Sequence, residues 1–192
     1  MFYEPILAAL VAMGRSLLGR AAALTAKLAK NGYTRVCFLG SGALHGVAQE
    51  SALKVLELNA GGIATLSETF LGLRHGPMSF IDEQTLVCAF LSGDSRTRRY
   101  ELDLLDEIRK KGLCQDLLLV TPSRLEVQQL TDNALDLETP RDFPDDCRPP
   151  LDVIVGQLLA LFLSIHNGIR PDTPSTGAIS RVVSHVKIYS PD

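Results

Sequence analysis

The sequence predicts an α/β fold of the doubly wound type, in which a five-stranded parallel sheet lies between two layers of helices. Short apolar runs suited to buried strands alternate along the chain with longer segments of helical periodicity. The run at 85–91 is apolar almost throughout, which is typical of a strand covered on both faces. This alternation favours a flavodoxin-like, three-layer αβα domain.

The first elements follow from apolar spacing and from glycine. Residues 6–30 have helical periodicity, and Asn31-Gly32 supplies the glycine that commonly follows a helix C-terminus. The apolar run at 35–39 predicts a short buried strand, and Gly40-Ser41-Gly42 then turns the chain into a helix over 43–58. A strand, a tight turn and a helix are the first half of a βαβ unit.

The same pattern continues to residue 170. A helix over 97–111 is indicated because its apolar residues share one side and Gly112 follows it. The other expected elements are a strand at 63–66, a helical turn ending near Ser79, strands at 85–91, 117–120 and 134–137, and an apolar helix at 151–167. We expect one domain over 1–192, with a leading helix at 1–32, an αβα core at 33–170 and an extended tail at 171–192.

Composition narrows the classes of partner. The 192 residues are 46% apolar and 21% charged with a net charge of −3, so no overall positive field would attract nucleic acid or an anionic membrane. No apolar run is expected to be long enough to span a bilayer. The four cysteines lack metal-type spacing, so we predict reduced core residues of a cytoplasmic protein and no metal site; they are Cys37, Cys88, Cys114 and Cys147. No cofactor is expected.

Three charges interrupt the otherwise apolar helix at 43–58. Glu50, Lys54 and Glu57 fall within a sector of roughly 60° on this helix. Because so apolar a helix is normally buried, we expect its charged side chains to have a structural or functional role. Glu57 is a candidate general base whose pKa burial would raise, and Lys54 would hold it ionised or bind a substrate oxygen. The alternative is an ordinary ion pair between residues three apart on a helix.

Two loops add candidate groups. Ligands of open parallel sheets bind outside the carboxyl ends of the strands, where Gly40-Ser41-Gly42 could offer backbone N–H groups to an anion. A tight turn without a ligand explains that tripeptide equally well. His75, in Arg74-His75-Gly76-Pro77, could act as acid or base near neutral pH, or be a turn residue held by a backbone partner.

Taken together, these segments resemble the second sugar-isomerase (SIS) domain of phosphosugar isomerases. The resemblance rests on Gly40-Ser41-Gly42, on ESALKVLEL at 50–58 and on Arg74-His75-Gly76-Pro77, with further similarity at 99–105, 171–175 and 180–183. It is strongest to the AgaS-type tagatose-6-phosphate ketose/aldose isomerases, which are also linked to galactosamine-6-phosphate deamination. The isomerase half of glucosamine-6-phosphate synthase is a more distant relative.

The resemblance implies a role for each candidate residue. Glu57 would be the base that moves a proton between C1 and C2 of an open-chain sugar, and Lys54 would be its neighbour. His75 would assist ring opening from across a dimer interface. Ser41, Gly42 and Arg181 would bind substrate, although the position of Arg181 is a lysine in the synthase. The implied partners are a phosphorylated sugar or amino sugar and a second copy of the chain, as a homodimer.

One departure from the family pattern bears on function. Such proteins carry two SIS domains, and the first holds a Ser/Thr-rich loop that binds the sugar phosphate. This chain resembles only the second, and Asp94 in its corresponding loop at 92–97 would repel a phosphate. We expect a sugar-phosphate isomerase or deaminase that works through an enolic intermediate, from a shortened product or one completed by another chain. The alternative is a non-catalytic phosphosugar-binding or assembly module.

Overall fold

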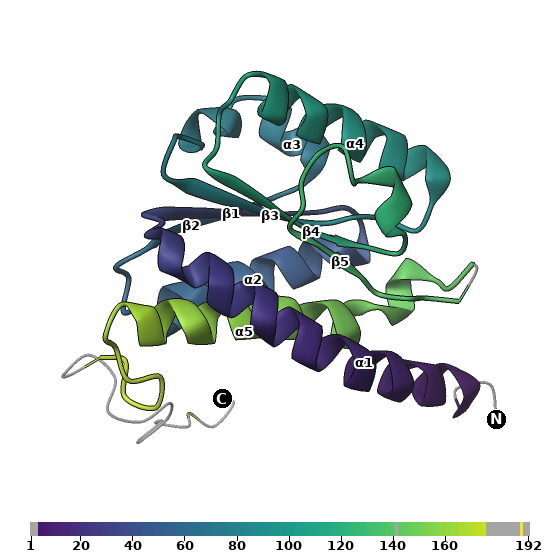
Figure 1. The fold of residues 1–192 in the computed structure, drawn as a ribbon, viewed down its shortest axis with the longest axis horizontal. Helices are drawn as coiled ribbons and strands as arrows, with labels where there is room; N and C mark the ends of the chain where they lie inside the picture. The colour runs from purple at the N-terminus through teal and green to yellow at the C-terminus, as the bar shows by residue number, and fades with distance from the viewer. Residues whose placement is uncertain (1–3, 141, 176–188, 190–192) are drawn as a thin grey trace.

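Five parallel strands form the central layer of the protein in the computed structural model (Figure 1). The structure describes residues 4–140, 142–175 and 189. The strands are β1 (Arg35–Gly40), β2 (Ala64–Glu68), β3 (Thr85–Phe90), β4 (Asp116–Thr121) and β5 (Ala134–Asp136). Their order in the sheet is β2-β1-β3-β4-β5, so the direction of winding reverses between β1 and β3. This reversal is the switch point at which doubly wound sheets open a crevice.

Helices cover both faces of the sheet (Figure 1). On one face lie α1 (Glu4–Leu28), α2 (Ala43–Leu58) and α5 (Pro149–His166); on the other lie α3 (Phe70–Arg74) and α4 (Ser95–Lys110). Short 3₁₀ helices complete the described elements: η1 (Ala29–Asn31), η2 (Pro77–Phe80), η3 (Arg124–Glu126) and η4 (Asp145–Cys147). The predicted doubly wound, flavodoxin-like αβα architecture is confirmed.

Each face of the sheet has its own apolar core, because neighbouring residues of a strand point to opposite sides. Val36 and Phe38 of β1 pack with α1, α2 and α5, whereas Cys37 and Leu39 pack with α3 and α4. All six residues of β3 are buried, as its apolar run predicts. Cys114 and Cys147, by contrast, are half-buried rather than core residues.

The observed helices and strands begin and end within two residues of the predicted positions. The helix predicted over 43–58 has those bounds, but β2 runs two residues beyond the predicted 63–66, to Glu68. β1 pairs with β2 from Arg35↔Ala64 to Leu39↔Glu68, so the ladder continues past the apolar run. An edge strand can carry polar residues because one side of it faces solvent. Most of the predicted tail at 171–192 lies outside the described residues.

Two helices have the length and composition of a membrane span. By length and composition alone, Glu4–Asn31 and Pro149–His166 would each reach across a bilayer, so the prediction that no apolar run is long enough is wrong. The core helix of a water-soluble protein has the same properties. α5 fits that description, because it packs against both α1 and α2 and buries Leu151, Val155 and Leu159.

Candidate functional site

The three charges of α2 form one connected group, as the helical spacing predicts. The Nζ atom of Lys54 lies 2.6 Å from Oε2 of Glu57 and 3.6 Å from Oε1 of Glu50. The hydrogen bond to Glu57 raises the pKa of Lys54, with a smaller contribution from Glu50, so the ammonium form is favoured.

The expectation that this pair is buried is wrong. The Glu57 side chain is 45% exposed, and Leu53 and Leu56 beside it are 43% and 44% exposed. The buried residues of α2 lie on its other side, against the sheet and α5; they are Leu44, Val47, Ala48, Ser51, Ala52 and Val55. The Lys54–Glu57 pair therefore faces outward beside exposed leucines.

Ser41 and Gly42 lie far from Glu57 within the chain. Gly42 caps the start of α2 with a φ of 56°, in the left-handed region that favours glycine. Glu57 lies about 22 Å further along the helix axis, at 1.5 Å per residue. Glu57 is thus near the end of the sheet at which β1 and β2 begin. Ser41 lies at the opposite end, where β1 finishes. Ser41 itself donates through Oγ to Oε1 of Glu101 at 2.6 Å.

His75 lies on the other face of the sheet from Glu57. It is exposed and directly follows α3, where its backbone N–H donates to the Gly72 carbonyl at 3.0 Å. Arg74 anchors this turn to α4 through Asp103 at 3.0 Å and Glu107 at 3.2 Å. Within one chain, the fold does not bring His75 to the Lys54–Glu57 pair. Arg181 lies outside the described residues.

At the switch point, a polar network that the sequence did not predict connects the loops after β1 and β3. The Glu101 carboxylate of α4, 1% exposed, accepts from Ser41 Oγ and, at 2.8 Å, from the backbone N–H of Ser92. It therefore links the loops that follow β1 and β3. Burial raises the pKa of Glu101, and its hydrogen bonds from Ser41 and Ser92 oppose that shift.

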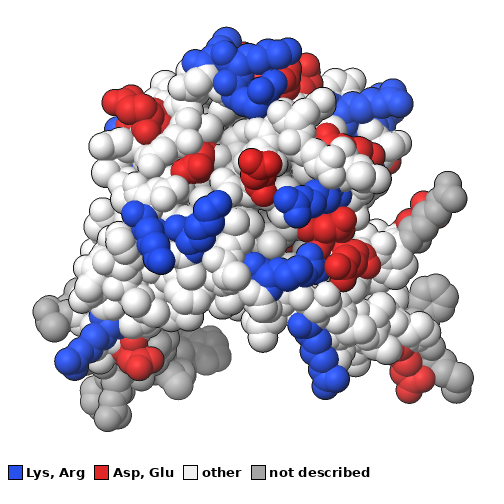
Figure 2. All heavy atoms as spheres, in the orientation of Figure 1, with Lys and Arg blue, Asp and Glu red and all other residues white. Residues whose placement is uncertain are grey.

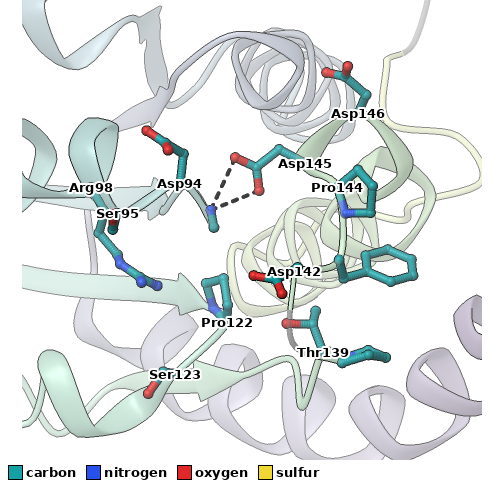
Figure 3. Close-up of a pocket in the computed structure, with 13 residues that line it drawn as sticks. Asp94, Ser95, Arg98, Pro122, Ser123, Thr139, Asp142, Pro144, Asp145 and Asp146 are labelled. Carbon is teal, nitrogen blue, oxygen red and sulfur yellow. Dashed lines mark hydrogen bonds between the residues drawn. The ribbon is translucent and has the colours of Figure 1, made fainter.

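Asp145 and Arg148 extend this network from η4 into the core. Asp145 accepts from Ser92 Oγ at 2.6 Å and from the backbone N–H of Gly93 at 2.8 Å (Figure 3). The fully buried guanidinium of Arg148 donates to Asp145 at 2.8 Å and to Asp152 at 2.7 Å. Complete burial raises the pKa of Asp152 to about 6, although Arg148 opposes the shift.

Two sequence signals could have revealed this network. Asp152 is the only charged residue of the apolar helix α5 apart from its terminal His166, and it stands between Leu151 and Val153. Glu101 precedes Leu104 and Leu105 by one helical turn, so it shares their buried side of α4. A carboxylate at a core position needs a partner, and here backbone N–H groups, hydroxyls and Arg148 supply it.

A cleft lies beside this network. It encloses about 710 Å³ between the ends of β3, β4 and η4. Gly93, Arg98, Pro122, Phe143 and Asp145 are among its lining residues (Figure 3). A smaller recess of about 170 Å³ lies between Ser41, Phe70 and Tyr100. Neither includes Glu57 or His75.

Charge and metal chemistry are less distinctive. On the face shown in Figure 2, acidic and basic side chains intermingle. Among the residues with described structure, no group of three or more His, Cys, Asp or Glu side chains could hold a metal ion.

Comparison with known proteins places this fold and its motifs in a class. No family model matches the chain. D-galactosamine-6-phosphate deaminase AgaS of Escherichia coli is 39% identical over 158 residues, which are 82% of this chain and 41% of that protein. The crystal structure of tagatose-6-phosphate ketose/aldose isomerase from Escherichia coli superposes with a TM-score of 0.77 at 32% identity, covering 92% of this chain and 46% of that one.

A third structure shares the fold alone. The C-terminal domain of glucosamine-fructose-6-phosphate aminotransferase from Francisella tularensis matches with a TM-score of 0.65 at 23% identity, over 86% of this chain and 46% of that one. The chain thus has the fold of a sugar-isomerase (SIS) domain. Among such proteins it is related to AgaS and to tagatose-6-phosphate ketose/aldose isomerase, and it spans less than half the length of either.

Proposed function

We propose that this chain is the base-bearing half of a phosphosugar aldose–ketose isomerase or amino-sugar-phosphate deaminase. The observation that carries the proposal is the Lys54–Glu57 pair, 2.6 Å apart, on the surface of a domain 39% identical to an AgaS deaminase. The resemblance assigns proton transfer to Glu57 and makes Lys54 its neighbour in the site. The proposed substrates are a phosphorylated sugar and its 2-amino counterpart.

The chemistry suits one carboxylate and one ammonium group. Glu57 would remove the proton from C2 of the open-chain aldose while the electrons of that C–H bond form a C1–C2 double bond and the carbonyl oxygen gains a proton. Returning the proton from Glu57 to C1, while the C2 hydroxyl gives up its proton and becomes the new carbonyl, gives the ketose; the proton lost at the C2 oxygen balances the one gained at the C1 oxygen. With an amine on C2, the same transfer gives an imine at C2, which water hydrolyses to ketose and ammonia. Lys54, held protonated, would keep Glu57 ionised and stabilise the developing oxygen anion.

The site would be completed by groups from outside this single domain. Glu57 is exposed, and His75 follows a helix on the opposite face of the sheet. We therefore propose a homodimer in which His75 of one protomer assists ring opening at the site of its partner. Ser41 and Gly42 begin α2 at its far end, which supports a role in building the fold more than in contacting this substrate. A cytoplasmic location fits a sugar-phosphate substrate.

A non-catalytic phosphosugar-binding or assembly module is the second candidate. The observation that favours it is that Ser41 and the N–H groups of Ser92 and Gly93 are already bonded to carboxylates of the same chain. Groups engaged in this way are not free to hold a substrate.

Turnover assays distinguish the two candidates. The chain is assayed with tagatose-6-phosphate and galactosamine-6-phosphate, alone and with the other half of an AgaS relative added. We expect Glu57→Gln to lower turnover by about 10²- to 10⁴-fold, the contribution of a positioned general base. Glu50→Gln, on the same stripe but 3.6 Å from Lys54, should change it only a few-fold.

Conversion of neither sugar, or full activity of Glu57→Gln, would reject the enzyme assignment. Thermal stabilisation by sugar phosphate without turnover would select the binding module, since a ligand that binds only the folded chain stabilises it by RT ln(1 + [L]/Kd).

A further inference from the structure

The turn that carries His75 is fixed along its backbone and exposed at its ring. Phe70 and Leu73 of α3 anchor it to the core at 1% and 0% exposure. After His75, Gly76 has a φ of 135°, which a side chain would disfavour, and its carbonyl accepts from the N–H and the hydroxyl of Ser79 at 3.1 and 3.0 Å. The His75 ring is exposed, and no described side chain hydrogen-bonds to it.

An arginine on each flank ties this turn to another element. Before His75, the Nη2 atom of Arg74 lies 3.0 Å from Oδ2 of Asp103 and 3.2 Å from Oε2 of Glu107. These two carboxylates are four residues apart on α4, so they stand one helical turn from each other. Arg74 therefore bridges both of them and joins the end of α3 to α4.

Arg35 holds the other flank of the turn. It is the first residue of β1, and its Nη1 atom donates to the carbonyl of Phe80, the last residue of η2, at 2.8 Å. The guanidinium also lies over the Phe80 ring, 5.4 Å from its centre, and pairs with Asp82 at 3.2 Å. Glu57 lies near this same end of the sheet, where β1 and β2 begin.

These contacts suit a role in positioning better than a role in overall stability. The side chains of Arg74 and Arg35 are 33% and 39% exposed, and ion pairs with that exposure contribute little to the free energy of unfolding. Each arginine nevertheless restricts the turn, because it joins the turn to an element that the core holds in place. Position matters at a reacting group, since a displacement of about 1 Å can cost about 10²-fold in rate.

We propose that Arg35 and Arg74 are positioning residues, which hold the His75 turn in place so that its ring reaches the site of the partner protomer. For the role of His75, this inference rests on the proposed function. Neither arginine would touch the substrate, because one is engaged with η2 and the other with α4. Both act through His75.

Amide hydrogen exchange tests the anchoring whether or not the chain turns over a sugar. Wild type, Arg35→Met, Arg74→Met and Lys111→Met are compared at the backbone N–H groups of residues 75–81, several of which donate within the turn. Lys111→Met is the matched control, because Lys111 pairs at 2.6 Å with the same Glu107 but caps the far end of α4. We expect exchange about 3- to 10-fold faster in both arginine variants, as the loss of exposed ion pairs predicts, and unchanged in the control. Equal exchange in all four proteins would overturn the proposal.

Kinetics test whether the arginines act through His75. In the turnover assay used for Glu57→Gln, Arg35→Met and Arg74→Met should each lower kcat by about 10-fold or more and leave KM within about two-fold. Arg74→Lys, which keeps the charge facing α4, should recover part of the loss. In a His75→Ala background the two arginine substitutions should have no further effect, because the ring they position is gone.

An equal loss of kcat with and without the His75 ring would also overturn the proposal. Absence of turnover in wild type is a different outcome, since it rejects the proposed function, and hydrogen exchange then decides by itself whether the two arginines hold the turn.

Discussion

Arg148 is the residue on which the polar interior depends. Its guanidinium is fully buried and joins Asp145, Asp152 and the Leu91 carbonyl. A buried ion pair contributes little beyond what an apolar replacement would give, because both charges lose their hydration. Removing only one partner is different, since the remaining carboxylates then lie in the interior without compensation.

We therefore expect Arg148→Met to lower the free energy of unfolding by about 3–5 kcal/mol. Arg109→Met is the control, because Arg109 lies on the surface of α4 and pairs only locally with Asp106. That substitution should change stability by no more than about 0.5 kcal/mol. Urea denaturation followed by circular dichroism measures both, and similar values for the two variants would contradict the role given to Arg148.

Asp152 predicts a dependence of stability on pH. Its folded pKa of about 6 exceeds the value near 3.9 expected for an unfolded aspartate, so between these values the folded chain binds the extra proton. The contribution of Asp152 to stability is therefore present below pH 4 and lost as pH rises toward 6. Asp152→Asn should remove a slope of up to about 1.4 kcal/mol per pH unit. Urea titrations from pH 4 to 7 test this, and parallel curves for the two proteins would refute it.

At the scale of elements, α2 and α5 pack in close contact. The contact is made at Ser51 and Gly156, where a Cβ added to Gly156 would collide with the Ser51 side chain and lie 3.2 Å from its Cα. Ser51 Oγ is buried and has no hydrogen-bond partner in the described part of the chain. Close approach, and not hydrogen bonding, is thus what these two residues contribute to the layer that positions Lys54 and Glu57.

Gly156→Ala should destabilise the protein by about 1–3 kcal/mol, the usual cost of overpacking. Gly46→Ala, at an exposed position of α2 with no atom in the way, should instead stabilise by roughly 0.5–1 kcal/mol, because alanine favours helix more than glycine does. Thermal or urea unfolding gives both values. Ser51→Gly combined with Gly156→Ala should recover part of the loss, and purely additive effects would argue against this contact.

At the scale of the whole molecule, an apolar stripe on α1 remains uncovered. Leu7, Val11 and Leu18 are 63%, 49% and 52% exposed and share one side of the helix. Ile165 of the adjacent α5 is 53% exposed. Exposed apolar surface of this kind commonly marks an interface, which supports the proposed homodimer.

Val11→Asp should shift the protein toward monomer at micromolar concentration, because a charge would be buried at the contact. Leu125→Asp is the control, since Leu125 is 80% exposed on η3, away from α1 and α5. Sedimentation velocity measures the change. A wild-type monomer at this concentration would count against the dimer, and equal effects of both substitutions would count against this surface.

The sequence predicted the fold more completely than it predicted the surroundings of the candidate site. The strand runs, the helix over 43–58 and the alternation of elements were predictable because local apolar periodicity determines them. The contact between Lys54 and Glu57 was predictable for the same reason, being three residues apart on one helix. Their exposure was not, because it depends on which side of α2 meets α5 and the sheet.

The sequence by itself thus determined the doubly wound fold, the stripe of charges on α2 and the relation to SIS domains. Tertiary structure alone decided that Gly42 and Glu57 lie at opposite ends of one helix, that His75 is on the other face of the sheet, and that Asp145 binds the loop after β3. The physical reason is the separation in sequence over which each kind of interaction acts. Helix and strand periodicity acts over a few residues, whereas the contact between Ser92 and Asp145 joins residues 53 apart and exists only once the sheet and its helices have packed.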